Sequence, residues 1–170
     1  MRTSLSVVVL ALLSAAPGDT VLLPKGRFAM SGELSIIIPH LTLKGAGIDQ
    51  TILEYGENAS GPQAIIAMAD YSTVEDLTIL NHPGDGIKAV AVKGPSFRRT
   101  KVEWTRRGDS MNGAYGLYPV LSTDVLMEDN IVIGASDSGI YVGQSNGIIV
   151  RRNRLEYNVA GIEIENSQRA

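Results

Sequence analysis

Apolar and polar residues alternate in short runs along much of this chain, and the same alternation returns after 22 or 23 residues. Glycines at positions 116, 139 and 161 each precede a triplet with apolar residues at its two ends. The three triplets are Leu117-Tyr118-Pro119, Ile140-Tyr141-Val142 and Ile162-Glu163-Ile164. Alternation predicts β-strands, because successive side chains of a strand point to opposite faces. A fixed period of about 20 to 50 residues predicts a solenoid, in which each unit buries its apolar face against its neighbours.

The similarity between repeats continues downstream of these glycines. The matched pairs are Val125 with Ile148, Met127 with Val150, Asn130 with Asn153, and Val132 with Leu155. β-Branched residues fill the apolar runs, and Gly, Asn, Asp and Ser interrupt them, which indicates about three short strands per repeat. We therefore expect each repeat to form one coil of a parallel β-helix, with equivalent residues stacked ~4.8 Å apart.

This stacking predicts columns of equivalent side chains. The expected core columns are Ile87, Leu117, Ile140 and Ile162, and Val102, Val132 and Leu155. Asn130 over Asn153, with Thr100 in the same register, predicts a side-chain amide ladder that satisfies open backbone groups. Glu128 and Arg151 are expected to form an outward pair of opposite charge.

Four motifs carry a resemblance to a known family: PGDTVLLPKG, LTLKGAG, GIYVGQSNGIIVRRNRLEYN and VAGIEIEN. They resemble the bacterial right-handed parallel β-helix repeat-containing proteins of the pectin-lyase-like superfamily, which also includes nitrous-oxide maturation proteins and mannuronan epimerases. The resemblance runs from about Pro17 to Asn166 and implies an all-β, single-stranded, right-handed β-helix of roughly five to six coils. Many members of the repeat family are exported proteins with no assigned reaction.

Residues 1–16 have two interpretations. Arg2, the apolar run from Leu5 to Leu13 and the small residues that follow it are typical of a secretory signal peptide, which implies a periplasmic or extracellular protein. The alternative is a short helix that caps the first coil, as similar segments do in the resembling family. The apolar run is far shorter than the ~20 residues that a membrane span needs.

We expect residues 17–170 to form one β-helix domain. Its first strands are predicted at 20–23, 36–38 and 41–43, and the segment GENASGPQ at 56–63 is predicted to be a polar loop. The chain finishes with an apolar strand at 162–164 and a short polar tail that resembles no cap. We therefore expect an incomplete C-terminal end, with further coils or self-association at an open edge.

Composition narrows the possible functions. The net charge of −3 and the lack of a basic run argue against nucleic acid as a partner. The chain has no cysteine, which excludes disulfides, thiolate metal sites and cysteine nucleophiles. His40 and His82 fall in different coils and show no ligand spacing, so we expect neither a metal nor another cofactor.

One corner of the predicted β-helix is irregular. Asn81, Trp104, Gly134 and Tyr157 occupy equivalent positions, and the leading glycine of the next strand follows them by 5, 12, 5 and 4 residues respectively. One coil therefore carries an insertion of about seven residues within TRRGDSMNGAYG, and solenoids often place such insertions on the binding face.

Ionisable and aromatic residues are expected to gather at this corner. The candidate catalytic residues are His82, Asp85, Asp109 and Asp137, and the candidate substrate-binding residues are Lys88, Arg106, Arg107, Tyr118 and Tyr141. Ser136 lies beside them, and Lys88, Tyr118, Tyr141 and Glu163 form one outward column. We expect the insertion, with its two arginines and Asp109, to form one wall of a groove against Tyr118 and Tyr141.

These residue types suit an acidic polysaccharide. Tyrosine offers an apolar face with a polar tip, and arginine can pair with a uronate carboxylate. If the protein is an enzyme, a polysaccharide lyase or epimerase would use His82, a tyrosine or Lys88 for proton transfer, and a glycoside hydrolase would use two of the aspartates.

A structural role accounts for the same residues without any reaction. Asp85 and Asp137 stand in turns, the two tyrosines can form a simple cross-strand ladder, and His82 before Pro83 is expected to be solvated. The sequence also lacks the Asp-Pro-His-Asp segment of mannuronan epimerases, the paired-aspartate signatures of polygalacturonases and the acidic calcium cluster of pectate lyases. The alternative function is a non-catalytic scaffold or protein-interaction module.

Overall fold

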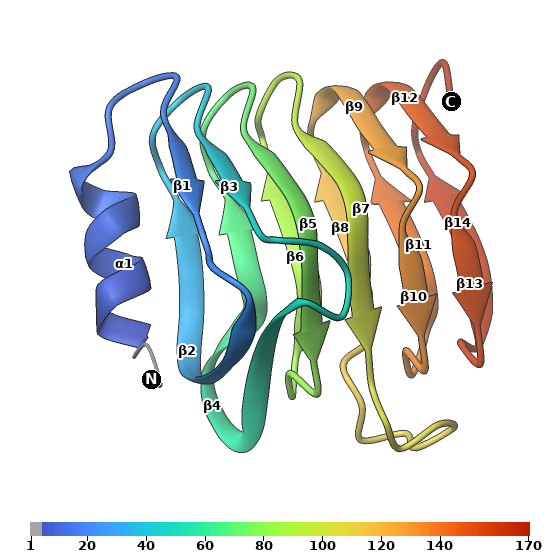
Figure 1. Cartoon of the computed structure of the whole chain (residues 1–170). Coiled ribbons are helices and arrows are strands. Elements are labelled where there is room, and N and C mark those ends of the chain that lie inside the picture. Colours follow the sequence, from blue (N-terminus) through green and yellow to red (C-terminus); the bar gives the residue numbers. More distant parts are fainter. Residues whose placement is uncertain (1–4) are drawn as a thin grey trace.

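The computed structural model describes residues 5–170, which form one helix followed by parallel strands wound into a solenoid (Figure 1). The elements are α1 (Leu5–Ser14), β1 (Thr20–Leu22), β2 (Gly26–Ile36), β3 (Thr42–Lys44), β4 (Thr51–Ala67), β5 (Thr73–Leu80), β6 (Asp85–Val90), β7 (Ser96–Glu103), β8 (Leu117–Val120), β9 (Thr123–Glu128), β10 (Ile131–Ile133), β11 (Ser138–Gly143), β12 (Asn146–Arg151), β13 (Arg154–Glu156) and β14 (Ala160–Glu165). Each strand pairs in parallel with its counterpart one coil away, as in the series β4-β6-β8-β11-β14. The predicted right-handed parallel β-helix is confirmed.

The core consists of the inward columns that the repeat predicted. Ile87 pairs with Leu117, Leu117 with Ile140 and Ile140 with Ile162, and the first three side chains are fully buried. Ile162 is 48% exposed because no coil of the described chain covers it. The column of Val102, Val132 and Leu155 is also confirmed by its register.

Two features of the first half differ from the predictions. Residues 26–36 form a long strand, β2, in which Phe28, Met30 and Leu34 point inward, whereas only its last residue was expected to be a strand. The predicted polar loop at 56–63 continues β4, largely exposed as far as residue 62 and buried at Gln63, and it pairs with β2 through Gly32 and Ser60. Backbone pairing with a neighbouring coil therefore keeps this polar segment extended, although its side chains show no apolar alternation.

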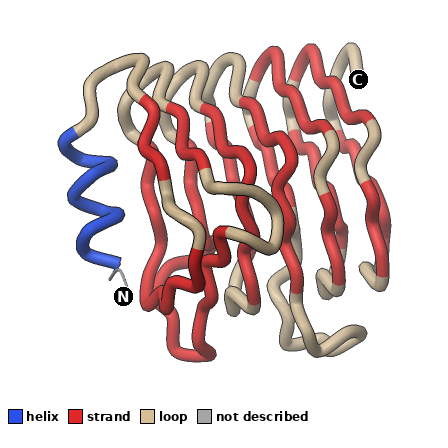
Figure 2. The backbone as a smooth tube through the Cα atoms, viewed as in Figure 1, coloured by secondary structure: helices blue, strands red, loops and turns tan. Residues whose placement is uncertain are grey.

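Helix α1 covers the open end of the first coil (Figure 2). Val8 and Leu12 are buried in the same core as Phe28, while Val7, Leu10 and Leu13 face outward and are exposed. Arg2, the positive charge of the predicted signal peptide, lies outside the described residues. No helix among residues 5–170 is long and apolar enough to span a membrane.

The predicted amide ladder is present at another corner of the coils. Asn130 Oδ1 accepts hydrogen bonds from the backbone N–H and the hydroxyl of Thr100, and Asn130 Nδ2 donates to Asn153 Oδ1 and Phe97 O. All four bonds are 2.8–3.0 Å long. The ladder holds successive coils in register because each amide joins a side chain or backbone group of the next coil.

Charged residues form a second ladder beside the amides. Lys44, Glu75, Arg98, Glu128 and Arg151 occupy one column in strand register, so the sign of the charge alternates from coil to coil. The expected pair of Arg151 with Glu128 is confirmed at 2.7 Å. Glu75 is the best-buried member, with 7% of its side chain exposed, and it pairs with Lys44, Arg98 and Arg99.

Candidate functional site

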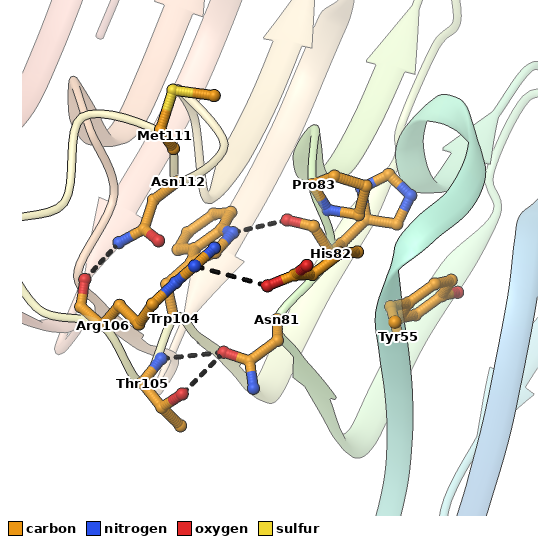
Figure 3. Close-up of a pocket in the computed structure, with 11 residues that line it drawn as sticks. Tyr55, Asn81, His82, Pro83, Trp104, Thr105, Arg106, Met111 and Asn112 are labelled. Atoms are coloured by element: carbon orange, nitrogen blue, oxygen red, sulfur yellow. Dashed lines mark hydrogen bonds and ion pairs between the residues drawn. The ribbon is translucent and has the colours of Figure 1, made fainter.

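The irregular corner holds a hollow between two long connections. Residues 81–84 turn tightly from β5 into β6, whereas the coil before them extends outward at 56–62 and the coil after them at 104–116. Both extensions protrude from the same end of the strands (Figure 1). They enclose a cavity of about 500 Å³, which we call the corner pocket, lined by residues 55–57, 81–83, 104–106 and 111–112 (Figure 3). The pocket exists because a short turn lies between two long ones.

Polar side chains hold the insertion in place. Asn81 Oδ1 accepts hydrogen bonds from the backbone N–H and hydroxyl of Thr105, at 2.8 and 3.0 Å. The buried Asn112 donates through Nδ2 to the carbonyl oxygens of Arg106 and Gly134, at 2.7 Å each. The insertion is therefore bonded to the coil before it and to the coil after it.

Three tyrosine rings pack together just beyond the corner. Tyr118 and Tyr141 are neighbours in the outward column, with ring centroids 5.3 Å apart. Tyr115, from the end of the insertion, lies 4.9 Å from Tyr118 and 4.7 Å from Tyr141. We call these three rings the tyrosine platform, and all three side chains are partly exposed.

Charged residues surround the tyrosine platform. The ammonium group of Lys88 lies 4.5 Å from the centroid of the Tyr118 ring, and Lys88 and Tyr118 are paired in register. The hydroxyl of Tyr141 donates a 2.8 Å hydrogen bond to Glu165. Asp85 accepts the backbone N–H of Tyr115 at 3.1 Å. The platform therefore has a cation at one end and carboxylates at its other end and at the corner.

The same surroundings decide which groups hold protons. Burial raises the pKa of Asp85. The hydrogen bond from Tyr115 and the charge of Lys88 act to lower it, but their effect is smaller. The hydrogen bond to Glu165 raises the pKa of Tyr141 to about 12, and burial together with the charge of Asp137 raises that of Tyr115. Both tyrosines keep their protons at neutral pH, so they are suited to donate hydrogen bonds rather than to act as bases.

His82 differs from the expectation of a solvated turn residue. Its side chain is fully buried, lies edge-on to Tyr55 at 4.7 Å between ring centroids, and accepts the Gly84 N–H at Nδ1. Burial lowers its pKa, so the neutral ring carries its proton on Nε2, which has no hydrogen-bond partner among the described residues. The His82 carbonyl accepts the Trp104 indole N–H at 2.6 Å, which joins this turn to the next coil.

The residues predicted for the insertion separate into different surroundings. Arg106 pairs with Glu57 at 3.4 Å and with Asp109 at 3.3 Å, on the side of the corner pocket. Arg107 lies 4.5 Å from the centroid of the Tyr157 ring, over a second hollow toward the C-terminal end that Asp109 and Ser136 also line. Ser136 donates to the Asn112 carbonyl. The two arginines thus have partners away from the tyrosine platform, and Tyr115 is the insertion residue that reaches it.

Sequence reasoning missed Tyr115, Glu57 and the pocket wall formed by Trp104. Tyr115 directly precedes Gly116, so its register with the predicted column could have indicated its position. Glu57 stands in a segment without alternation or repeat spacing, so no sequence pattern indicated its position. Among residues 5–170, no group of three His, Asp or Glu side chains is arranged to hold a metal ion.

Comparisons with known proteins agree with this fold. A family model described as "Right handed beta helix region" matches residues 104–170. No curated protein sequence matches the chain. The fold is that of right-handed parallel β-helix proteins, as the motifs predicted.

Three solved structures illustrate the likeness. A mannuronan C-5 epimerase A-module from Azotobacter vinelandii is 18% identical with a TM-score of 0.74, over 98% of this chain and 55% of that one. An alginate lyase from a Paenibacillus species is 20% identical with a TM-score of 0.68, over 95% of this chain and 63% of that one. A pectin methylesterase from Erwinia chrysanthemi is 12% identical with a TM-score of 0.58, over 84% of this chain and 48% of that one. The chain therefore spans less than two thirds of the length of each structure.

Proposed function

We propose that this protein binds an acidic polysaccharide across the tyrosine platform. The observation that carries the proposal is the cluster of three partly exposed tyrosine rings beside Lys88. Aromatic faces pack against the apolar faces of sugar rings, while the hydroxyl groups at their tips bond to polar substituents. The fold supports the proposal as an analogy, since the similar structures include enzymes named for mannuronan, alginate and pectin.

Lys88 is the proposed partner of the sugar carboxylate. Its ammonium group lies 4.5 Å from the centroid of the Tyr118 ring, so a uronate unit that packs against the platform would have its carboxylate within reach of this cation. The partners of Arg106 and Arg107 lie away from the platform, which leaves Lys88 as the residue on which selectivity for acidic polymers depends.

A binding assay with matched variants tests this function. We expect calorimetry to show binding of oligomannuronate or oligogalacturonate, and Tyr118→Ala to weaken it about five- to tenfold through the loss of one aromatic contact. Lys88→Gln should lower the affinity for acidic oligomers by about two- to fivefold and leave the affinity for neutral oligomers unchanged. Tyr71→Ala and Lys25→Gln, which lie elsewhere, serve as controls. Equal affinity in wild type and Tyr118→Ala would exclude the platform as the binding surface.

Modification of the bound polymer would require proton transfer beside the platform. Asp85 is the best-supported candidate, because burial raises its pKa and it is held by the backbone of Tyr115. Asp137 is the second candidate, since its charge raises the pKa of Tyr115 and it therefore lies near the same ring. A lyase would be detected by the ultraviolet absorbance of the unsaturated product. We expect Asp85→Asn to abolish any such activity while leaving binding intact, and unchanged turnover would exclude that role.

Export from the cytoplasm is part of the proposal. Val7, Leu10 and Leu13 form an outward apolar face on α1 that is 55–65% exposed. A helix that stays at a water-facing surface normally carries polar residues there, so this face favours the signal-peptide interpretation over a permanent cap. N-terminal sequencing of protein secreted by a bacterial host tests it: a mature chain that begins near position 17 supports export, and an intact Met1 in the cytosol contradicts it.

An interaction module is the second candidate function. The strand edges of the last coil carry no partner strand in the described chain, and Val159, Ile162 and Ile164 are exposed there. Such an edge can pair with another chain. Analytical ultracentrifugation would support this function by detecting a dimer that Ile162→Lys abolishes, and a monomer at all concentrations would contradict self-association.

A further inference from the structure

The corner pocket is separate from the tyrosine platform and has the size and lining of a ligand site. Its volume of about 500 Å³ lies within the range of roughly 300 to 1,000 Å³ that small-molecule sites occupy. Two walls come from extensions of different coils, and the floor is the tight turn at 81–83. A binding site on a solenoid is expected where such extensions face each other.

Apolar groups line one part of the corner pocket. The Trp104 ring is fixed by the hydrogen bond from its indole N–H to the His82 carbonyl. Met111 stands at the tip of the insertion and is 75% exposed, without a place in the core. Trp104 is only 2% exposed, so the flexible Met111 provides most of the apolar surface that a ring-shaped ligand can contact.

Polar groups converge from both walls. Glu57, from the extension of β4, faces Arg106, from the insertion, with Nη1 and Oε1 3.4 Å apart. Asn81 uses its Oδ1 to hold Thr105, while its amide hydrogens have no acceptor among the described residues. The pocket therefore presents one acceptor carboxylate, one donor amide and one donor guanidinium, which Asp109 also contacts from outside the pocket lining.

We infer that the corner pocket is a saccharide subsite for a neutral pyranose unit with two adjacent free hydroxyl groups. One hydroxyl donates to Glu57 and its neighbour accepts from Arg106, since each hydroxyl offers one donor and two acceptor positions. The ring lies against the exposed Met111, close to the buried Trp104. A uronate carboxylate is disfavoured because it would approach Glu57. The pocket thus differs in preference from the tyrosine platform, and the inference does not depend on the platform binding a polymer.

Trp104 makes the pocket directly observable, because it is the only tryptophan of the chain. The probes are methyl α-glucoside, methyl α-mannoside and methyl α-galactoside, with glucuronate as the charged counterpart. We expect at least one neutral glycoside to change tryptophan fluorescence with saturation at millimolar concentration, and glucuronate to bind more weakly.

Variants separate the pocket from the platform. Glu57→Gln and Arg106→Gln should each raise the dissociation constant measured by fluorescence about tenfold, as expected for the loss of one charged hydrogen bond. Met111→Ala should also raise it, whereas Met68→Ala and Tyr118→Ala should leave it unchanged. Glu57 and Arg106 have exposed side chains, so their replacement is not expected to unfold the protein. No response to any neutral glycoside, or a response that survives in the Glu57→Gln/Arg106→Gln double variant, would overturn the inference.

Discussion

Replacement of the stacked glycines by alanine tests the coil register in a graded way. Gly86, Gly116, Gly139 and Gly161 lead equivalent strands, and the backbone of each approaches that of the next coil. An alanine methyl at Gly116 would lie 2.6 Å from the Gly139 carbonyl oxygen and would collide with Val132 Cγ1. At Gly86 it would collide with the Gly116 carbonyl oxygen.

The clash decreases toward the C-terminal end of the column. At Gly139 the nearest carbonyl oxygen, that of Gly161, is 3.1 Å away, and the closest atom is the side-chain nitrogen of Asn158 at 2.7 Å. At Gly161 the nearest atom is Leu155 Cδ1, at an ordinary contact distance of 3.8 Å. The four positions therefore form a series with one kind of backbone environment and decreasing overlap.

The expected free energies follow from this series. Overpacking against a fixed backbone costs about 1–3 kcal/mol, so Gly86→Ala and Gly116→Ala should each lower the free energy of unfolding by about 3 kcal/mol and Gly139→Ala by about 1 kcal/mol. Gly161→Ala should be neutral or raise it by up to about 1 kcal/mol, because alanine reduces the freedom of the unfolded chain.

Urea denaturation followed by circular dichroism measures these differences as shifts in midpoint at constant slope. The loss in free energy of unfolding should be largest for Gly86→Ala and Gly116→Ala, smaller for Gly139→Ala and smallest for Gly161→Ala. If all four variants lose equal stability, or if Gly161→Ala is as costly as Gly116→Ala, approach to the next coil is not the reason for glycine at this corner.

Other predictions concern the two ladders. Asn130→Ala should lower the free energy of unfolding by about 2–3 kcal/mol in the same assay, because buried groups of Thr100 lose their acceptor; a loss below ~0.5 kcal/mol would contradict the amide ladder. Glu75→Gln should cost about 1–3 kcal/mol, since it removes the shared partner of Lys44, Arg98 and Arg99, whose exposure limits the penalty. Burial acts to raise the pKa of Glu75, but the hydrogen bond from Lys44 and the nearby arginines hold it below its usual value. Its contribution to stability should therefore be complete above the unfolded-state pKa of about 4.5 and be lost as the pH falls through the lower folded-state pKa, and the acid limb of a stability–pH curve should flatten in Glu75→Gln.

The periodic part of the molecule could be predicted from sequence because the coils impose equal spacing on their residues. Gly116, Gly139 and Gly161 set the register, and with it the stacking of Tyr118 on Tyr141 and of Asn130 on Asn153. The strand β2 and the ribbon at 56–61 were missed, because their extended conformation results from pairing between coils rather than from alternation in their own side chains.

The site was less predictable because its residues lie outside the repeat. Arg106 and Arg107 are long side chains on an irregular loop, and their partners Glu57 and Tyr157 come from positions that no spacing links to them. His82 was expected in solvent because it precedes a proline in a turn, yet the extensions on both sides of that turn cover it. The tyrosine column was predictable in contrast, since two of its three rings belong to the repeat.

Chemical footprinting of tyrosines tests the central claim most directly. Iodination of the protein with and without a bound uronate oligomer, followed by mass spectrometry, reports which rings the ligand covers. We expect the oligomer to protect Tyr115, Tyr118 and Tyr141, and we expect Tyr71 and Tyr157 to be equally reactive with and without it. Unchanged reactivity of Tyr118 and Tyr141 in the presence of a saturating ligand, or protection confined to Tyr71 or Tyr157, would contradict it.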